Sequence, residues 1–344
     1  MKEVHEHRGG NLLLKLKHLF ANTDLATFVV KNWEYENLDY FQYWRVSANA
    51  IYPFQNKDGI CYLRMAPVGE KEENDIRAEL EFLNYLKSEG FKAIEPVPSN
   101  NGNDLELVDT PWGTYYGAVF KKASGKSLED ADLTLETVHQ YGAKLGKLHN
   151  LSQHYQPKTH KRKSWLDILN WIEQLLSEFP NEHKALLEVH ILKECFAFME
   201  VTEDNFGLIH YDFEFDNVFY DAETNEITPI DFDDAMYHWY GMDVEQAIDS
   251  LKDCDKFDDI DNAVEEFIKG YRSERALSEE MLNNSQVFRR FANLYGYARI
   301  LRSAEEQWDN EPDWLINLRR KFSNLLENRR ATFGLDRNRC GSEK

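Results

Sequence analysis

Residues 207–234 of this 344-residue chain read GLIHYDFEFDNVFYDAETNEITPIDFDD. Two short β-rich runs flank the polar turn DAETNE, so we expect them to pair as a hairpin. The loop before this hairpin holds His210, Asp212 and Asn217. Asp231 follows the second strand. The hairpin should therefore hold two carboxylates and one amide at the same end.

These three polar side chains, Asp212, Asn217 and Asp231, have the chemistry that phosphoryl transfer requires. Carboxylate and amide oxygens suit Mg²⁺, which usually binds few protein groups together with substrate phosphates. One Asp would orient or deprotonate an attacking hydroxyl, while an Asn and an Asp would hold the metal on a nucleotide. The alternative is an acidic surface turn whose side chains are satisfied locally. The placement of His-x-Asp-x₄-Asn before a hairpin that ends in Ile-Asp-Phe favours a functional site.

The composition indicates a folded, acidic protein of two domains or two lobes. The chain has 40 Lys and Arg against 61 Asp and Glu, a formal net charge of −21, and 42% of its residues are hydrophobic. The apolar content excludes a disordered chain, and the negative charge argues against nucleic acid and anionic membranes as partners. The four Cys lack CxxC spacing, and neither a signal peptide nor a transmembrane run is visible. We therefore expect a cytoplasmic protein that binds neither nucleic acid nor a membrane.

The chain changes character from β-rich to helical after a short connector. Residues 43–66 predict a hairpin, and VPSNNGNDLELV and GTYYGAVFKK indicate two further strands. A helix should span residues 74–89. We expect an α+β fold with a small β-rich lobe that contains one helix and a larger, mainly helical lobe. The expected boundaries are 1–122 for the first lobe, 123–126 for the connector, 127–330 for the second lobe and 331–344 for a tail.

The segment IHYDFEFDN…ITPIDFDDA resembles the aminoglycoside phosphotransferase/choline kinase family, small-molecule kinases of protein-kinase-like fold. The resemblance covers most of the chain. It implies that Asp212 is the catalytic base, that Asn217 and Asp231 are metal ligands, and that His210 is a structural member of the catalytic loop. Asp243 falls where the family has an Asp that supports this loop from the following helix. The implied cofactors are Mg²⁺ and ATP, with GTP as the alternative nucleotide.

Two residues of the first lobe fit the same family. Arg64 lies in the expected strand ICYLRMA, where the family has a Lys or Arg that reaches the ATP phosphates. Glu79 falls on the apolar stripe of the expected helix, and burying an unpaired carboxylate is costly. We therefore predict an ion pair between Arg64 and Glu79, as in kinase-like active sites. The alternatives are a solvated Arg64 and a Glu79 that reaches water at the edge of the stripe.

The connector resembles the hinge of this family, whose backbone faces the adenine. The resemblance assigns this role to the backbone of Lys121, Lys122 and Ala123. Asn49 matches a position where relatives commonly carry Asn, although the first hairpin lacks a GxGxxG motif. Asn49 is accordingly predicted to lie in the nucleotide site.

The acceptor should be a small molecule. Only eleven residues separate Asp231 from Asp243, whereas a protein kinase needs a longer segment to dock a peptide. Carboxylates with aromatic rings would suit an amine-bearing alcohol through ion pairing and cation–π contacts. Packing in the core is the alternative for each aromatic ring. The candidate acceptor residues are Glu214, Asp233, Asp234, Tyr237, Trp239 and Trp308.

The sequence thus predicts an ATP-dependent phosphotransferase that acts on a hydroxyl of a small molecule. A metal-dependent phosphohydrolase built on the same acidic loop is one alternative, but it leaves Arg64 and Glu79 without a role. A catalytically silent nucleotide-binding protein is the other alternative. The intact set of Asp212, Asn217 and Asp231 argues against it.

Overall fold

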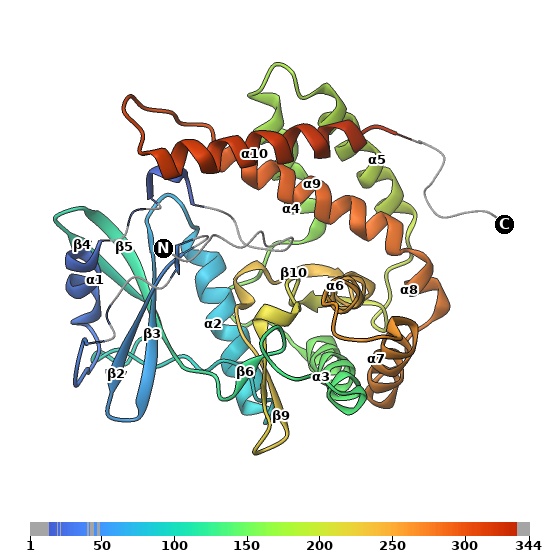
Figure 1. Ribbon diagram of the computed structural model, residues 1–344, viewed down its shortest axis with the longest axis horizontal. Coiled ribbons are helices and arrows are strands. Elements are labelled where there is room, and N and C mark those ends of the chain that lie inside the picture. The colour runs from blue at the N-terminus through green and yellow to red at the C-terminus, as the bar shows by residue number, and fades with distance from the viewer. Residues whose placement is uncertain are drawn as a thin grey trace.

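The chain folds into a small β-sheet lobe and a larger helical lobe in the computed structural model (Figure 1). The structure describes residues 14–18, 20, 22–39, 41, 45–46 and 49–335. This arrangement confirms the predicted bilobal α+β fold. Residues 43–44, at the start of the first predicted hairpin, and residues 336–344 of the predicted tail lie outside the described residues.

A five-stranded antiparallel sheet forms the small lobe, with the strand order β1-β2-β3-β5-β4. The register pairs Arg64 with Ile51 on one side and with Ala118 on the other, which places Arg64 on the central strand. The strands are β1 (Arg45–Val46), β2 (Ala50–Asn56), β3 (Gly59–Pro67), β4 (Glu106–Thr110) and β5 (Gly113–Lys121).

A helix covers each face of this sheet. Helix α2 (Glu73–Ser88) carries Glu79 and lies close to the predicted range. Helix α1 (Thr23–Val30) was not predicted; it begins at Asn22, whose side chain accepts a hydrogen bond from the Leu25 amide. The apolar side of α1 packs with buried side chains of β2 and β3 in a second core. The small lobe therefore has two helices, and both faces of its sheet are covered.

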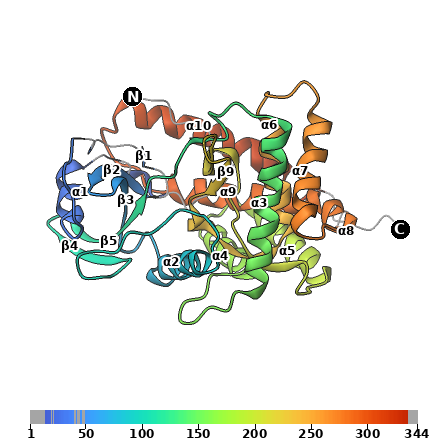
Figure 2. The same ribbon diagram turned by 90° about the horizontal axis from the view of Figure 1, so that it is seen from below.

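The helical lobe is built around two helices in very close contact, α3 (Leu135–His154) and α7 (Ile260–Glu274), which lie side by side in Figures 1 and 2. Glycine permits this approach, because a Cβ added at Gly142 would lie 2.0 Å from the carbonyl oxygen of Phe267. The remaining helices of this lobe are α4 (Trp165–Ser177), α5 (His183–Phe198), α6 (Gly241–Asp253), α8 (Glu279–Asn283), α9 (Ser285–Ser303) and α10 (Asp313–Thr332).

Short strands at the boundary of the two lobes carry the predicted site. Strands β8 (Val218–Asp221) and β9 (Glu226–Pro229) pair in the predicted hairpin. The Ile230 amide donates to the Asn217 carbonyl at 2.9 Å, so the two ends of the motif meet. Strand β6 (Lys126–Ser127) of the connector joins this hairpin, while β7 (Phe206–Ile209) pairs with β10 (Met236–Trp239). The three 3₁₀ turns are η1 (Leu16–His18), η2 (Phe215–Asn217) and η3 (Phe232–Asp234).

The helices give no sign of a membrane span. Within the described ranges, none of them is both long enough and apolar enough to cross a bilayer.

Candidate functional site

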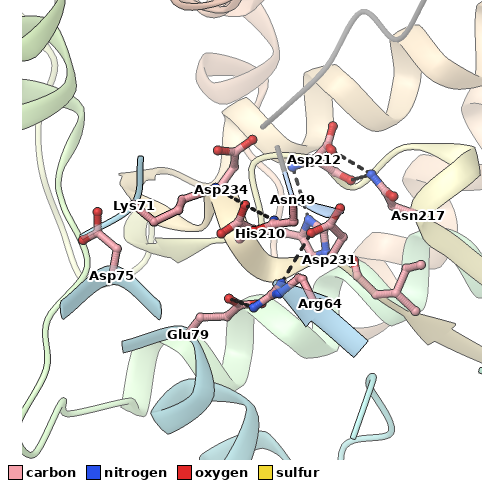
Figure 3. A network of polar contacts seen from close by, with 12 residues as sticks. Asn49, Arg64, Lys71, Asp75, Glu79, His210, Asp212, Asn217, Asp231 and Asp234 are labelled. Carbon is pink, nitrogen blue, oxygen red and sulfur yellow. Dashed lines mark hydrogen bonds and ion pairs between the residues drawn. The ribbon is translucent and has the colours of Figure 1, made fainter. Parts of the chain in front are cut away.

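Asp212 and Asn217 lie against each other between β7 and β8 (Figure 3). Asn217 Nδ2 donates to Asp212 Oδ2 at 2.7 Å and to the Asp212 carbonyl at 3.2 Å. Both side chains are buried. Because the amide nitrogen faces Asp212, the orientation of Asn217 is fixed, and its Oδ1 is directed away from that carboxylate.

Asp243 of helix α6 supports the loop that carries Asp212. Its carboxylate accepts the backbone amides of His210 at 2.8 Å and Tyr211 at 2.7 Å. Tyr211 has a φ of 68°, an unusual conformation for a bulky residue, and these two bonds hold it there. His149 of α3 adds a third contact to Asp243 at 3.0 Å. The predicted contact between Asp243 and the loop is therefore present.

His210 connects the loop to the end of β9. Its Nε2 lies 2.9 Å from the Ile230 carbonyl, and its Nδ1 accepts the Asp212 amide at 3.2 Å. The ring is fully buried, and burial lowers the pKa of this imidazole. Both ring nitrogens are used inside the protein, so His210 has the geometry of a structural member of the loop rather than of a group that contacts substrate.

Asp231 stands at the start of η3 and faces the small lobe. It has a φ of 60°, in the left-handed region, directly after the buried strand β9. Its Oδ1 lies 3.8 Å from Arg64 Nη1, and its side chain is 30% exposed. A residue of the central strand of the small lobe thus meets the hairpin of the helical lobe.

Arg64 also forms the predicted ion pair with Glu79. The guanidinium binds both carboxylate oxygens, with Nη1–Oε1 at 2.9 Å and Nη2–Oε2 at 2.5 Å. Glu79 is only 1% exposed. Burial lowers the pKa of Arg64, but the charge of Glu79 outweighs it and leaves that pKa above its usual value. Two parallel bonds of this kind fix the plane of the guanidinium.

Negative charge accumulates around Asp212. Burial raises the pKa of its carboxyl well above the usual range, and Glu214, Asp216 and Asp234 raise it further. Glu214 and Asp216 are half-buried residues of the same loop. A cation that approaches Asp212 would therefore be attracted, and it would favour the ionised form of this carboxyl.

The residues predicted to bind the acceptor do not all lie together. Asp233 binds Lys71 Nζ at 2.5 Å, and Asn49 Nδ2 donates to the same Asp233 oxygen at 3.0 Å. Asp234 binds Arg299 Nη2 at 3.2 Å. Each of these two carboxylates is thus paired with a cation of the protein. In this structure the amide nitrogen of Asn49, predicted for the nucleotide site, is hydrogen-bonded to Asp233.

The three aromatic residues predicted for the acceptor site lie in different surroundings, and one of these predictions, Trp239, needs correction. Trp239 is 1% exposed and packs against Phe196 in the core, with its Nε1 bonded to a backbone carbonyl, so it cannot line an acceptor site. Tyr237 lies on the same side of β10 and lines a separate cleft beside the start of α4. Trp308 packs against Phe20, with ring centroids 6.3 Å apart, in the loop before α10. Tyr237 and Trp239 are two residues apart on β10, so their side chains leave the same side of this strand.

Two backbone amides beside the connector are already hydrogen-bonded within the small lobe. The Lys121 amide donates to the Glu95 carbonyl at 3.0 Å, and the Lys122 amide donates to the Ile60 carbonyl at 3.0 Å. The Lys121 side chain is exposed and pairs with Glu95 at 2.9 Å. The amides of Lys121 and Lys122 are therefore occupied. A purine could be read only by carbonyl groups of these residues or by the backbone of Ala123.

Two buried basic residues near this site, Lys71 and Arg162, are not predicted from the sequence. Lys71 lies in the turn before α2 and binds Asp233. Arg162, from the loop before α4, donates to the carbonyls of Asp233 at 2.5 Å, Ala235 at 2.5 Å and Asp75 at 2.8 Å. A basic run such as KRKS normally indicates a solvated segment, and only the tertiary contacts reveal the buried member.

The donor set fits a hard divalent cation with few protein ligands. Asn217 offers an amide oxygen and Asp231 a partly exposed carboxylate, beside the buried Asp212. The described part of the chain contains no cluster of three or more His, Cys, Asp or Glu side chains in a metal-binding arrangement. A site with one carboxylate and one amide leaves coordination positions for water and phosphate oxygens, which is the usual situation for Mg²⁺.

The profile of the phosphotransferase enzyme family matches residues 47–279, more than half of the chain. The chain therefore belongs to the phosphotransferase enzyme family. It is similar to the amicoumacin kinase of Bacillus subtilis (strain 168), with 25% identity over 293 residues that cover 80% of this chain and 84% of the relative. The family and this relative make the protein a small-molecule kinase.

Solved structures support the protein-kinase-like fold. An amicoumacin kinase in complex with AMP-PNP, Ca²⁺ and Ami has a TM-score of 0.74 at 21% identity, covering 94% of this chain and 98% of that one. A microcompartment-associated aminopropanol kinase has a TM-score of 0.66 at 21% identity, with coverages of 90% and 96%. A spectinomycin phosphotransferase in complex with ADP and spectinomycin has a TM-score of 0.59 at 14% identity, with coverages of 90% and 94%.

Proposed function

We propose that this small-molecule kinase transfers the γ-phosphate of ATP to a hydroxyl of an amine-bearing acceptor, with Mg²⁺ as its metal. The observation that carries the proposal is the convergence of Asp212, Asn217 and Asp231 opposite the paired Arg64. These side chains come from both lobes, as a site between nucleotide and acceptor requires.

In the proposed mechanism, Asp212 orients the acceptor hydroxyl and takes its proton. Its bond to Asn217 fixes the carboxylate, and the contacts of Asp243 fix the backbone on which it stands. Arg64, oriented by Glu79, would bind the nucleotide phosphates through the remaining face of its guanidinium. Asn217 and Asp231 would hold Mg²⁺, which neutralises the phosphate charge when it is bound.

The amine-bearing acceptor is proposed from the electrostatics of the catalytic loop. The attraction for a cationic acceptor is assigned to Glu214 and Asp216, which belong to the same loop as Asp212. These two carboxylates lie close enough to Asp212 to raise its pKa. A positive charge on the acceptor would reduce this repulsion as it binds.

A screen for acceptor-dependent ADP release tests the proposal. Amino alcohols, amino sugars, amicoumacin and neutral sugars should be compared with ATP and with GTP, at low and at high salt. We expect amine-bearing acceptors to have the highest kcat/KM, and we expect this advantage to shrink at high salt and in Glu214→Gln and Asp216→Asn. A neutral sugar as the best acceptor, with no effect of salt, would contradict the acceptor class. Hydrolysis of phosphate esters without nucleotide would contradict the kinase mechanism.

A further inference from the structure

Two adjacent residues of opposite charge, Glu70 and Lys71, connect the small lobe to the helical lobe. They lie in the turn between β3 and α2, where Gly69 adopts a φ of +96° and Val68 bridges back to Lys71. The side chains of Glu70 and Lys71 are each only 8% exposed. Charged side chains are rarely buried to this extent unless they are paired.

Lys71 binds the segment that follows the proposed metal ligand. Its Nζ lies 2.5 Å from Asp233 Oδ2, and Asp233 is two residues after Asp231. The same carboxylate oxygen accepts Asn49 Nδ2 at 3.0 Å, while Arg162 donates to the Asp233 carbonyl at 2.5 Å. Asp233 is therefore held through both its side chain and its backbone, and Lys71 supplies a charged contact from the small lobe.

Glu70 binds helix α9 of the helical lobe. Its Oε2 lies 2.9 Å from Arg302 Nη2, near the end of α9, and its Oε1 lies 3.5 Å from His18 Nε2. The side chains of Arg302 and Glu70 are 13% and 8% exposed. Consecutive residues of one turn thus bind two separate elements of the helical lobe.

The turn lies at the opposite end of β3 from the hinge. In the register of β3 and β5, Cys61 pairs with Lys121 beside the connector, whereas Pro67 pairs with Tyr115 at the other end. The chain therefore joins the lobes at one end of the central strand, and Glu70 and Lys71 add charged contacts at the other. These contacts oppose bending at the hinge in addition to helix α2, which shares a core with the helical lobe.

We propose that Glu70 and Lys71 act as an interlobe clip, a pair of positioning residues that fixes the closure of the two lobes and so sets Asp231 opposite Arg64. The inference rests on the proposed function, because the roles of Arg64 and Asp231 come from it. Separation of the lobes would break the ion pairs of Lys71 with Asp233 and of Glu70 with Arg302, so these contacts favour the closed arrangement. Phosphoryl transfer depends on the separation that this closure fixes.

The clip is tested with Lys71→Met, Glu70→Gln and the double variant in the full-length enzyme. Lys193→Met is the matched control, because Lys193 pairs with Glu173 at 2.6 Å entirely within the helical lobe. Small-angle X-ray scattering would report the closure of the lobes, and steady-state kinetics would report kcat and KM for ATP and for the acceptor separately. Lys71→Arg preserves the charge and should behave like the wild type.

We expect the clip variants to have a larger radius of gyration than the control. We also expect kcat/KM for ATP to fall by about 10- to 100-fold, mainly through KM, since a displacement of about 1 Å can have an effect of this size. Wild-type scattering in both single variants would overturn the clip, as would expansion without any change in kcat/KM for ATP. If Lys71→Met does not fold, Glu70→Gln carries the test. If the wild type phosphorylates no acceptor, the proposed function fails, and scattering alone still decides whether these residues hold the lobes.

Discussion

The guanidinium of Arg64 binds both oxygens of Glu79, at 2.9 and 2.5 Å, and lies 3.8 Å from the carboxylate of Asp231. One basic side chain therefore connects the central strand, helix α2 and the hairpin of the other lobe. Because Glu79 is nearly inaccessible to water, the pair has a single favoured geometry. The position of α2 consequently determines where Arg64 can meet a phosphate group.

Arg64 and Glu79 should be energetically coupled. In a double-mutant cycle on ATP affinity with Arg64→Met and Glu79→Gln, we expect a coupling free energy of about 0.5–3 kcal/mol, as for residues in direct contact. Isothermal titration calorimetry would measure it. The exposed pair of Arg77 and Glu73 on the same helix is the control cycle, and it should show almost no coupling to ATP affinity. Additive effects of Arg64→Met and Glu79→Gln would contradict the role of the pair.

Asp212→Asn should remove the base and leave the loop intact. An Asn at this position can still accept the hydrogen bond from Asn217, so nucleotide affinity should stay near that of the wild type. We expect kcat to fall by about 10²–10⁴-fold, the usual contribution of a positioned general base. Steady-state kinetics with the best acceptor would measure this change. Asp221→Asn, at the far end of the hairpin, is the matched control, and a variant at 212 that keeps its kcat would remove Asp212 from the mechanism.

Asp231→Ala should weaken the Mg²⁺-dependent part of ATP binding and abolish turnover, because the metal would lose its charged protein ligand. Asn217→Ala should have the same effect in milder form, since an amide oxygen carries no net charge. Titration of ATP with and without Mg²⁺ separates metal-dependent from metal-independent affinity. Wild-type behaviour of both variants would place the metal elsewhere.

Glu70 should make folding stability depend on pH in the acid range. Burial raises its pKa, but bonds from His18 and Arg302 outweigh this effect and lower the pKa to about 2. A carboxyl whose pKa is lower in the folded state stabilises the protein above the unfolded pKa of about 4.3, and this stabilisation is lost as the pH falls toward the folded value. Its full size should be on the order of 3 kcal/mol.

Urea unfolding of the wild type and Glu70→Gln at a series of pH values would measure this effect. We expect the difference in unfolding free energy to be largest near pH 6 and to decrease steadily between about pH 5 and pH 2. Glu73→Gln is the control, because Glu73 forms an exposed pair whose contribution should be small at every pH. A difference for Glu70→Gln that stays constant down to pH 2 would contradict the buried ion pairs of this residue.

The features that could be predicted from the sequence have strong local signals. The hairpin after Asn217 combines two β-rich runs with a polar turn, and the structure confirms that these runs pair. Glu79 was recognisable because a carboxylate interrupted an apolar stripe, and the structure confirms its pair with Arg64. In both cases a short segment of sequence contained the information. For Glu79, the cost of burying an unpaired charge also indicated that this carboxylate needs a basic partner.

The remaining features depend on contacts between distant parts of the chain. Lys71 and Asp233 are 162 residues apart, and nothing near either one indicates the other. Asp233 and Asp234 are adjacent in the sequence, yet the 3₁₀ turn sends one to Lys71 and the other to Arg299. An aromatic ring near acidic residues suggests contact with an amine-bearing acceptor, but Trp239 of β10, which pairs with β7, lies in the core.

The most direct test of the central claim is to detect the phosphorylated product. Purified enzyme should be incubated with ATP, Mg²⁺ and each amine-bearing alcohol of the acceptor panel, and mass spectrometry should follow the acceptor while ADP is measured in parallel. We predict that one or more of these acceptors gains a single phosphoryl group in an amount equal to the ADP formed, and that Asp212→Asn forms almost none. ADP formed with release of free phosphate and no modified acceptor, or equal product from Asp212→Asn, would contradict a kinase that uses Asp212 as its base.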